Sequence, residues 1–281
     1  MRNEGELSKK KNFNLFENGY VILDFLERDY FDAMQEEIKS VFGFNPTLFH
    51  EQKMDDDHRL QLIKHTKDIL VKKKYVKNCV LANTACFLPL LGPDIDIQSD
   101  MHLRVSRPQR EEDFINWHRD TFYGNSHWEL NFWMPIFPLE QGAGLLVVDR
   151  SHSSLAVNVR HIQEQNTFRK QVLKGSIANE LGYQYAPKSD SVIDAIAESD
   201  PSQIKLLAPK VGQAVLFFAH CVHRAQNLSS KTRVSIDVRI KHMLASTNTK
   251  PGYYEPLIRS DVAKYVEKMQ FLEKEALGLS H

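Results

Sequence analysis

Hydrophobic residues recur at helical spacing near the start of the chain and alternate with polar residues further on. Between Asp29 and Val41 the apolar positions repeat as in an amphipathic helix, and a second helical region runs from about Asp55 to Lys74. Ahead of both, residues 16–23 indicate a turn followed by a short strand. The pattern therefore predicts an N-terminal, mainly helical region over about residues 1–100.

From residue 101 onward the pattern changes to short apolar runs separated by turn residues. Six runs have the length and alternation of strands: Met101–Val105, Phe114–His118, Leu130–Ile136, Gly144–Val148, Ala214–Phe218 and Val234–Ile240. Many short strands with turns between them are typical of an all-β sandwich or barrel. We therefore expect a β core over about residues 101–241.

Two further segments complete the expected organisation. Residues 153–209 interrupt the strand pattern with a polar stretch, which we interpret as a long insertion with helices at His161–Val172 and Ser189–Ile196. Residues 260–277 carry apolar side chains on one face and predict a final amphipathic helix. Because no repeat or Gly/Ser/Pro-rich linker divides the chain, we expect residues 1–281 to form one domain.

Composition narrows the class of protein without pointing to a chemistry. The 36 basic residues equal the 36 acidic ones, whereas a nucleic-acid-binding protein usually has a basic excess. No apolar run approaches the roughly 20 residues that span a bilayer. The three cysteines, Cys79, Cys86 and Cys221, suit a reducing compartment better than a disulfide scaffold. These features predict a cytoplasmic protein with no nucleic-acid or membrane partner.

The segment around His118 carries the first chemical signal. On a strand, His118 and Asp120 project from the same face, because side chains alternate between the two faces. A second apolar strand is followed by His220 and His223, and either of these can supply a third ligand. Two histidines and a carboxylate with open coordination positions form the facial triad of non-heme Fe(II) oxygenases.

A later strand adds a candidate binding group. Along residues 232–239, Arg233 and Ser235 share one face with Asp237, and the valines and isoleucine occupy the other. An arginine inside a barrel requires an anionic partner, because an unpaired buried charge is very unfavourable. That partner is either a ligand carboxylate, held by the guanidinium and the serine, or Asp237 in an internal salt bridge.

The order of these motifs resembles the Fe(II)/2-oxoglutarate-dependent oxygenases, and in particular the phytanoyl-CoA dioxygenase-like family. Besides His-x-Asp, a distal His and Arg-x-Ser, three further segments are similar to the family's sequences: residues 17–23, residues 130–136 and residues 142–152. The resemblance extends over about residues 16–241. It departs at Asp149-Arg150, where the family usually has Pro-Gly before the Ser-His dipeptide.

The resemblance implies a double-stranded β-helix (jelly-roll, cupin-like) core with flanking helices, and it implies roles for particular residues. Fe(II) would be bound by His118, Asp120 and His223, where counting from Gly212 and the position of Asn227 favour His223 over His220. The cosubstrate 2-oxoglutarate would contact Arg233 and Ser235. Tryptophan lies against 2-oxoglutarate in the family, so Trp133 is a candidate for that pocket and Asn131 a weaker one, with plain core packing as the alternative.

The predicted activity is a non-heme dioxygenase that consumes O2 and 2-oxoglutarate and hydroxylates, desaturates or cyclises a small molecule. Arg104 and Arg107 precede the His-x-Asp motif and could reach an anionic substrate, although structural arginines are the more frequent explanation. Basic residues in the insertion, such as Arg160 and Arg169, hint at a polar or anionic substrate. The insertion and the helical region at residues 55–74 are the expected lid.

Two other classes of protein remain open at this stage. A cupin-like enzyme could use the same ligands for isomerisation, or for oxygen chemistry without 2-oxoglutarate. A barrel could also bind a ligand without catalysis. Arg233 with Ser235 counts against the first class, and the complete set of metal-ligand positions counts against the second.

Overall fold

The computed structural model describes residues 14–123, 125–153, 169–171, 185–187, 200–247 and 249–276. Its larger sheet is antiparallel and runs in the order β1-β10-β5-β12-β2-β13, with β3 paired to the first half of β12. The strands are β1 (Tyr20–Asp24), β2 (Ile95–Gln98), β3 (His102–Ser106), β5 (Glu129–Pro135), β10 (Gln213–Phe218), β12 (Arg233–His242) and β13 (Tyr254–Ile258).

A smaller antiparallel sheet faces the first and has the order β4-β11-β6-β9. Its strands are β4 (Ile115–His118), β6 (Leu145–Val148), β9 (Ile204–Leu207) and β11 (His223–Ala225). Apolar side chains from both sheets meet between them, among them Trp133, Val147 and Phe217. Two facing antiparallel sheets with this core confirm the expected jelly-roll, cupin-like fold.

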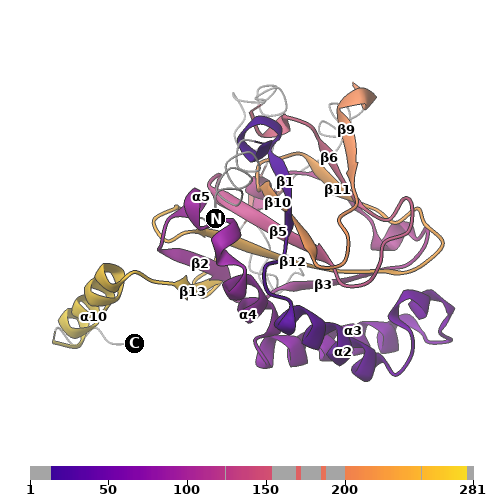
Figure 1. Cartoon of the computed structure of the whole chain (residues 1–281), viewed down its shortest axis with the longest axis horizontal. Helices are drawn as coiled ribbons and strands as arrows, with labels where there is room; N and C mark the ends of the chain where they lie inside the picture. Colours follow the sequence, from indigo (N-terminus) through magenta and orange to yellow (C-terminus); the bar gives the residue numbers. More distant parts are fainter. Residues whose placement is uncertain are drawn as a thin grey trace.

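Helices cover the outer face of the larger sheet (Figure 1). They are α2 (Asp29–Phe42), α3 (Asp56–Lys72) and α4 (Tyr75–Ala82), with the short α5 (Leu88–Leu91) and the 3-10 turn η1 (Pro46–Glu51) beside them. Phe31, Met34 and Ile38 of α2 pack against Phe132 and Ile236 of the sheet. The predicted alternation is thus confirmed, since one face of β5 and β12 meets the helices and the other faces the smaller sheet.

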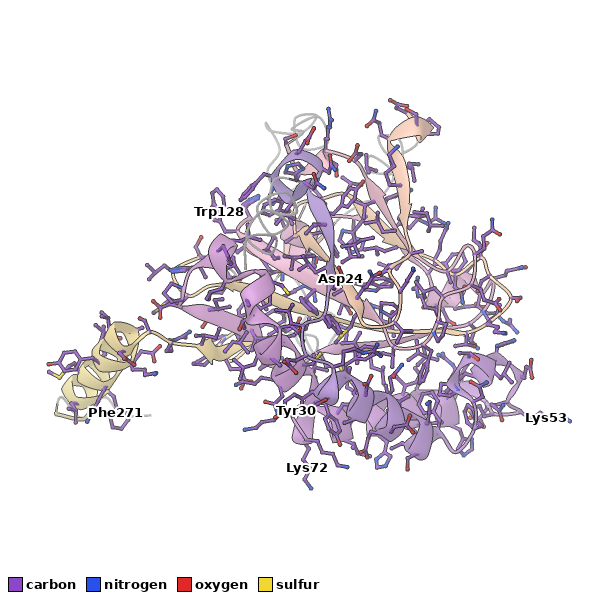
Figure 2. The ribbon with its side chains drawn as sticks, viewed as in Figure 1. Asp24, Tyr30, Lys53, Lys72, Trp128 and Phe271 are labelled. Carbon is purple, nitrogen blue, oxygen red and sulfur yellow. The ribbon has the colours of Figure 1, made fainter. Side chains whose placement is uncertain are left out.

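The helix α10 (Asp261–Ala276) follows β13 and stands away from the strands (Figure 1). The sequence predicts this helix correctly. Its apolar face is exposed, including Val262, Tyr265 and Val266, and Figure 2 shows Phe271 on the same projecting helix. None of the helices in the described part of the chain is long and apolar enough to cross a bilayer.

Three expectations about local structure are wrong. Residues 14–18 are helical, so the turn expected there is a helix end, closed at Gly19 (φ 90°). The helix expected at His161–Val172 is wrong at its C-terminal end, where β7 (Arg169–Gln171) pairs with β8 (Tyr185–Pro187). The insertion also ends before residue 204, because β9 pairs with β6 as a strand of the smaller sheet.

The helix predicted at Ser189–Ile196 lies outside the described residues, as does most of the expected insertion. Gly19 is required at its position for a second reason. A Cβ there would lie 2.5 Å from Nδ1 of His152 and 2.6 Å from Sγ of Cys221. The end of the first helical segment therefore packs too tightly against these side chains for any larger residue.

Candidate metal and cosubstrate site

Strand pairing brings the two predicted histidine ligands together. His118 ends β4 and His223 begins β11, and the two residues are direct partners in the antiparallel register. Their ring centroids lie 4.1 Å apart. Paired residues of neighbouring strands have their side chains on one face, so residues 105 positions apart in the sequence reach a common point.

Asp120 joins them from a turn rather than from the strand that we expected. β4 ends at His118, and Asp120 opens the 3-10 turn η4 (Asp120–Tyr123), anchored by a hydrogen bond from its backbone N–H to the carbonyl of Ala219. Its Oδ1 lies 3.4 Å from Nε2 of His118 and 4.0 Å from Nε2 of His223. The three ligand atoms fall within 4.8 Å of one another, close enough to share one metal ion.

His223 is held in the form that a metal ligand requires. Its Nδ1 lies 3.0 Å from the carbonyl of Cys221, so a proton on Nδ1 is donated there and Nε2 keeps its lone pair. Burial, and then the neighbouring His118, lower the pKa of His223 to about 3. The imidazole is therefore neutral near neutral pH, with its free lone pair directed at the shared point.

The second oxygen of Asp120 is occupied by protein donors. Its Oδ2 accepts a hydrogen bond from Nδ2 of Asn131 at 2.7 Å and two from Arg239, at 3.1 and 3.2 Å. Burial would raise the pKa of Asp120, but Arg239 and then the two histidines hold it well below its ordinary value. Asp120 is therefore a carboxylate with Oδ2 fixed by protein donors and Oδ1 facing the two histidines. We call this group, with His118 and His223, the metal end of the pocket.

Arg233 lies further along the same face of β12 and is buried without a carboxylate partner among the described residues. Its Nη1 donates to the carbonyls of Ala143, Gly144 and Gln226, and its Nη2 donates to Oγ of Ser106 at 3.0 Å. Burial lowers its pKa to about 10, so the guanidinium stays charged at neutral pH. The side chain is thus fixed in place as a buried positive charge, with no carboxylate of the described residues in ion-pair contact.

Three buried polar atoms near this guanidinium have no hydrogen-bond partner in the described structure. They are Nε of Arg233, Oγ of Ser235 and Nε1 of Trp133. Ser235 is two residues from Arg233 on the same face of β12, and the Trp133 ring lies 5.9 Å from the guanidinium carbon. Buried polar atoms are rarely left unpaired, so this group, which we call the arginine end, has the character of an incomplete anion site.

The internal salt bridge considered for Arg233 is wrong, because Asp237 pairs with Arg104. Nε and Nη2 of Arg104 donate to the two oxygens of Asp237 at 3.1 and 3.2 Å. Arg104 lines the metal cavity but is engaged in this pair, so its role in substrate binding stays a prediction. Arg107 forms a bidentate pair with Asp113 and lines a separate surface pocket, in line with a structural arginine.

Of the remaining predicted residues, Asn131 lies at the metal end, whereas His220 and Asn227 lie outside it. His220 follows β10 in a turn and stacks on Phe218 with a centroid distance of 5.2 Å, away from the triad, so His223 is the histidine at the metal end. The two histidines do not share a strand, because β10 ends at Phe218 and β11 begins at His223. Asn227 braces the following loop through hydrogen bonds to the carbonyls of Ser106 and Lys231, both at 2.8 Å. Asn131 lies at the metal end, on Asp120, and not at the arginine end.

Sequence reasoning missed the partners behind the metal end. Arg239 shares the pocket face of β12 with Arg233, which the alternation showed, but nothing local indicated that it would contact Asp120. Glu129 is also buried there, 3.4 Å from Nε of Arg239. Burial, and then the charge of Asp120, raise the pKa of Glu129 to about 7 in spite of Arg239. No signal in the sequence distinguishes Glu129 from an ordinary strand residue.

The cavity at the metal end is small, about 20 Å³, and Trp133 is the residue of the arginine end that reaches it. It is lined by the triad and by Arg104, Asn131, Trp133, Phe217, Asp237 and Arg239, with three smaller apolar residues. That space accommodates an ion or a water molecule but no larger ligand without movement of the lining side chains. β8, from the segment expected to supply a lid, lies beside η4, which carries Asp120.

Solved structures resemble this chain in fold at low sequence identity. A nickel complex of the non-heme monooxygenase ThoJ is 12% identical with a TM-score of 0.53, covering 89% of this chain and 84% of that one. EctD from S. alaskensis, solved with 2-oxoglutarate and 5-hydroxyectoine, is 13% identical with a TM-score of 0.53, covering 92% of this chain and 86% of that one. The chain has the fold of non-heme, 2-oxoglutarate-dependent enzymes.

This shared fold confirms the architecture that the motif resemblance implied. No protein-family model matches the sequence, and no curated protein matches it. At such low identity the likeness extends to the fold, so the chemistry must be argued from the side chains themselves.

Proposed function

We propose that the chain is a non-heme Fe(II)- and 2-oxoglutarate-dependent oxygenase acting on a small molecule, with its residues 1–281 working as one domain. The single observation that carries the proposal is the pairing of two incomplete sites on one pocket face. The metal end presents two imidazole nitrogens and a carboxylate oxygen toward one point. The arginine end presents buried donors without acceptors.

The donor set at the metal end fits iron. Two imidazoles and one carboxylate suit a divalent transition metal and leave three of six octahedral positions open. When bound, iron and 2-oxoglutarate supply the oxidising chemistry, in which O2 is consumed and succinate and CO2 are released. The chain's own residues orient these groups. His223 is fixed by Cys221, and Asp120 by Asn131 and Arg239.

The donors at the arginine end fit a carboxylate. Nη1 of Arg233 is engaged by backbone carbonyls and Nη2 donates one hydrogen bond to Ser106, which leaves Nε to donate to a ligand, beside the hydroxyl of Ser235 and the indole N–H of Trp133. A bidentate carboxylate would offset the buried positive charge and satisfy these atoms. We assign the distal carboxylate of 2-oxoglutarate to this place. In support, EctD, which has a similar fold, was solved with 2-oxoglutarate.

Hydroxylation is the proposed outcome, with desaturation or ring closure as variants of the same oxidation. The presence of Asp120 favours these oxidations over halogenation, since halogenases of the resembled superfamily lack the carboxylate ligand. The proposed substrate is a small molecule with polar or anionic groups, and the Arg104–Asp237 ion pair lines the cavity beside the metal end, where it offers polar contacts. No described feature favours a cupin-type isomerase, which would have no use for the unfilled donors around Arg233.

The experiment is substrate-independent conversion of 2-oxoglutarate to succinate by the iron-loaded full chain. Asp120→Ala is expected to reduce succinate release to background, because the metal loses an essential ligand. Arg233→Ala is expected to raise the 2-oxoglutarate requirement about 100-fold, since charge-assisted hydrogen bonds are lost. Undiminished succinate release in both variants would refute the assignment. A wild-type protein that binds iron yet gains no thermal stability from N-oxalylglycine would favour the isomerase class instead.

A further inference from the structure

We propose that Arg239 is a positioning residue that limits Asp120 to one metal-binding oxygen. The inference rests on the proposed metal site and goes beyond it, because it assigns a role to a residue outside the ligand set. Asp120 Oδ2 accepts three hydrogen bonds, two from Arg239 and one from Asn131. A carboxylate oxygen has about two lone-pair directions, so Oδ2 has none left for a metal ion.

The other oxygen lies outside these three hydrogen bonds. Oδ1 is the atom that faces Nε2 of His118 at 3.4 Å and Nε2 of His223 at 4.0 Å. With Oδ2 occupied, Asp120 can bind a metal only through Oδ1. Two histidines and one oxygen then leave three octahedral positions, whereas a bidentate Asp120 would leave two. Arg239 thereby keeps open a position that a two-pronged cosubstrate and O2 together require.

Arg239 can perform this role because it is itself held directly from two strands, and from a third through Glu129. Its Nη1 donates to Oε1 of Gln98 on β2 at 3.2 Å, and its Nε lies 3.4 Å from Oε1 of Glu129 on β5. Glu129 in turn accepts two hydrogen bonds from Asn125, both at 2.9 Å, and one from the hydroxyl of Tyr254 on β13. Arg239 and Glu129 are 2% and 0% exposed.

Two effects of Arg239 on metal binding oppose each other. Its positive charge disfavours a nearby cation, so removal of charge alone would tighten metal binding. Its fork fixes the ligand oxygen, and loss of such a supporting partner typically weakens metal affinity about 10- to 100-fold. In a buried site held from three strands, we expect the loss of orientation to exceed the relief of repulsion.

The test is titration of the metal-free full chain with Co(II), followed by visible absorption, which reports both affinity and coordination. Arg239→Met is expected to bind Co(II) at least about tenfold more weakly and with an altered spectrum. Arg239→Lys keeps the charge but lacks the fork, so it is expected to resemble Arg239→Met. Arg107→Met is the control, since Arg107 also pairs with an aspartate, Asp113, through its Nε and Nη2 but lies away from the metal end, and its Co(II) binding should match wild type.

Affinity and spectrum like those of wild type in Arg239→Met, or tighter binding, would overturn the proposal. If Arg239→Met does not fold, Glu129→Gln removes the charge behind Arg239 with little change of shape. It is then expected to weaken Co(II) binding about threefold or more, and unchanged binding in both Glu129→Gln and Arg239→Lys would overturn the proposal.

Asp120→Ala separates failure of this inference from failure of the proposed function. If Asp120→Ala loses Co(II) binding while the Arg239 variants retain it, the metal site stands and only the positioning role is wrong. If wild type does not bind Co(II), or Asp120→Ala binds it equally well, both the metal site and the inference are refuted.

Discussion

The two ends of the pocket face of β12 differ in how completely the protein pairs its own charged groups. At the metal end, Asp120, Arg239 and Glu129 form a connected chain in which each charge meets an opposite charge. At the arginine end, Arg233 is buried beside donors that have no acceptor. The ion pairs at the metal end hold the ligand atom Oδ1 of Asp120 in place before a metal binds. The unpaired donors at the arginine end favour binding of an external ligand that accepts hydrogen bonds.

The largest expected effect tests how much the completed end stabilises the fold. Arg239→Met leaves Asp120 buried without its charge partner, and breaking a buried pair in this way typically destabilises a protein by about 3–5 kcal/mol. Urea unfolding of the metal-free protein measures the change. A loss below about 1 kcal/mol would show that the pair contributes little and that the two ends differ less than the hydrogen bonds indicate.

The second expected effect is a pH dependence of stability that comes from Glu129 at the metal end. The pKa of Glu129 is about 7 in the folded protein against an ordinary 4.5, so the folded state binds the extra proton between these values. Stability contributed by this group therefore falls as pH rises from 4.5 to 7, by up to about 3 kcal/mol. Glu129→Gln should abolish that decline, while Arg239, Asp120 and Tyr254 remain in both proteins. Parallel stability profiles from pH 5 to 8 would contradict this assignment.

A pair of truncations compares the two ends directly. Asn131→Ala removes a donor that Asp120 uses and should lower stability by about 1–3 kcal/mol. Ser235→Ala removes a buried hydroxyl that has no partner in the free protein, so stability should be unchanged or higher by up to about 1 kcal/mol. Equal losses in both variants, measured by urea unfolding, would mean that the hydroxyl is already satisfied without a ligand.

The smallest expected effect is on cosubstrate binding alone. Trp133→Phe keeps the ring against Arg233 but removes the indole N–H, which has no acceptor in the free protein. The affinity for 2-oxoglutarate should fall about 3- to 10-fold with little change in stability, since one hydrogen bond is lost only in the complex. Calorimetric titration measures the affinity, and a variant that binds as tightly as wild type would remove Trp133 from the proposed site.

Local patterns predicted those parts of the fold whose signal is local. β5 and β12 alternate clearly because one face packs on the helices, and α2 has an apolar stripe for the same reason. The sequence did not predict β2, β11 or β13. β11 has three residues, and β13 contains Pro256, so their strand geometry depends on partners from distant segments. The cytoplasmic location expected from composition stays a prediction.

The candidate site divides in the same way. His118 and Asp120 are two residues apart, so a local motif could find them, and strand alternation singled out Arg233. The family resemblance favoured His223 over His220 and gave Arg233 its proposed ligand. The contact between Arg239 and Asp120 joins residues 119 positions apart and depends on the register of β12 against β5 and on the turn after β4. Glu129 and Tyr254 lie 125 positions apart. Such contacts follow from tertiary geometry and leave no mark in the local sequence pattern.

Calorimetric titration of 2-oxoglutarate into the Mn(II)-loaded full chain tests most directly whether the arginine end binds a carboxylate of the cosubstrate. Arg233→Gln should bind 2-oxoglutarate about 100-fold more weakly than wild type, because the charge-assisted fork is lost. Its affinity for Mn(II) should stay within about twofold of wild type, since the metal ligands are untouched. Equal 2-oxoglutarate affinity in the two proteins, or no binding by wild type, would contradict the account.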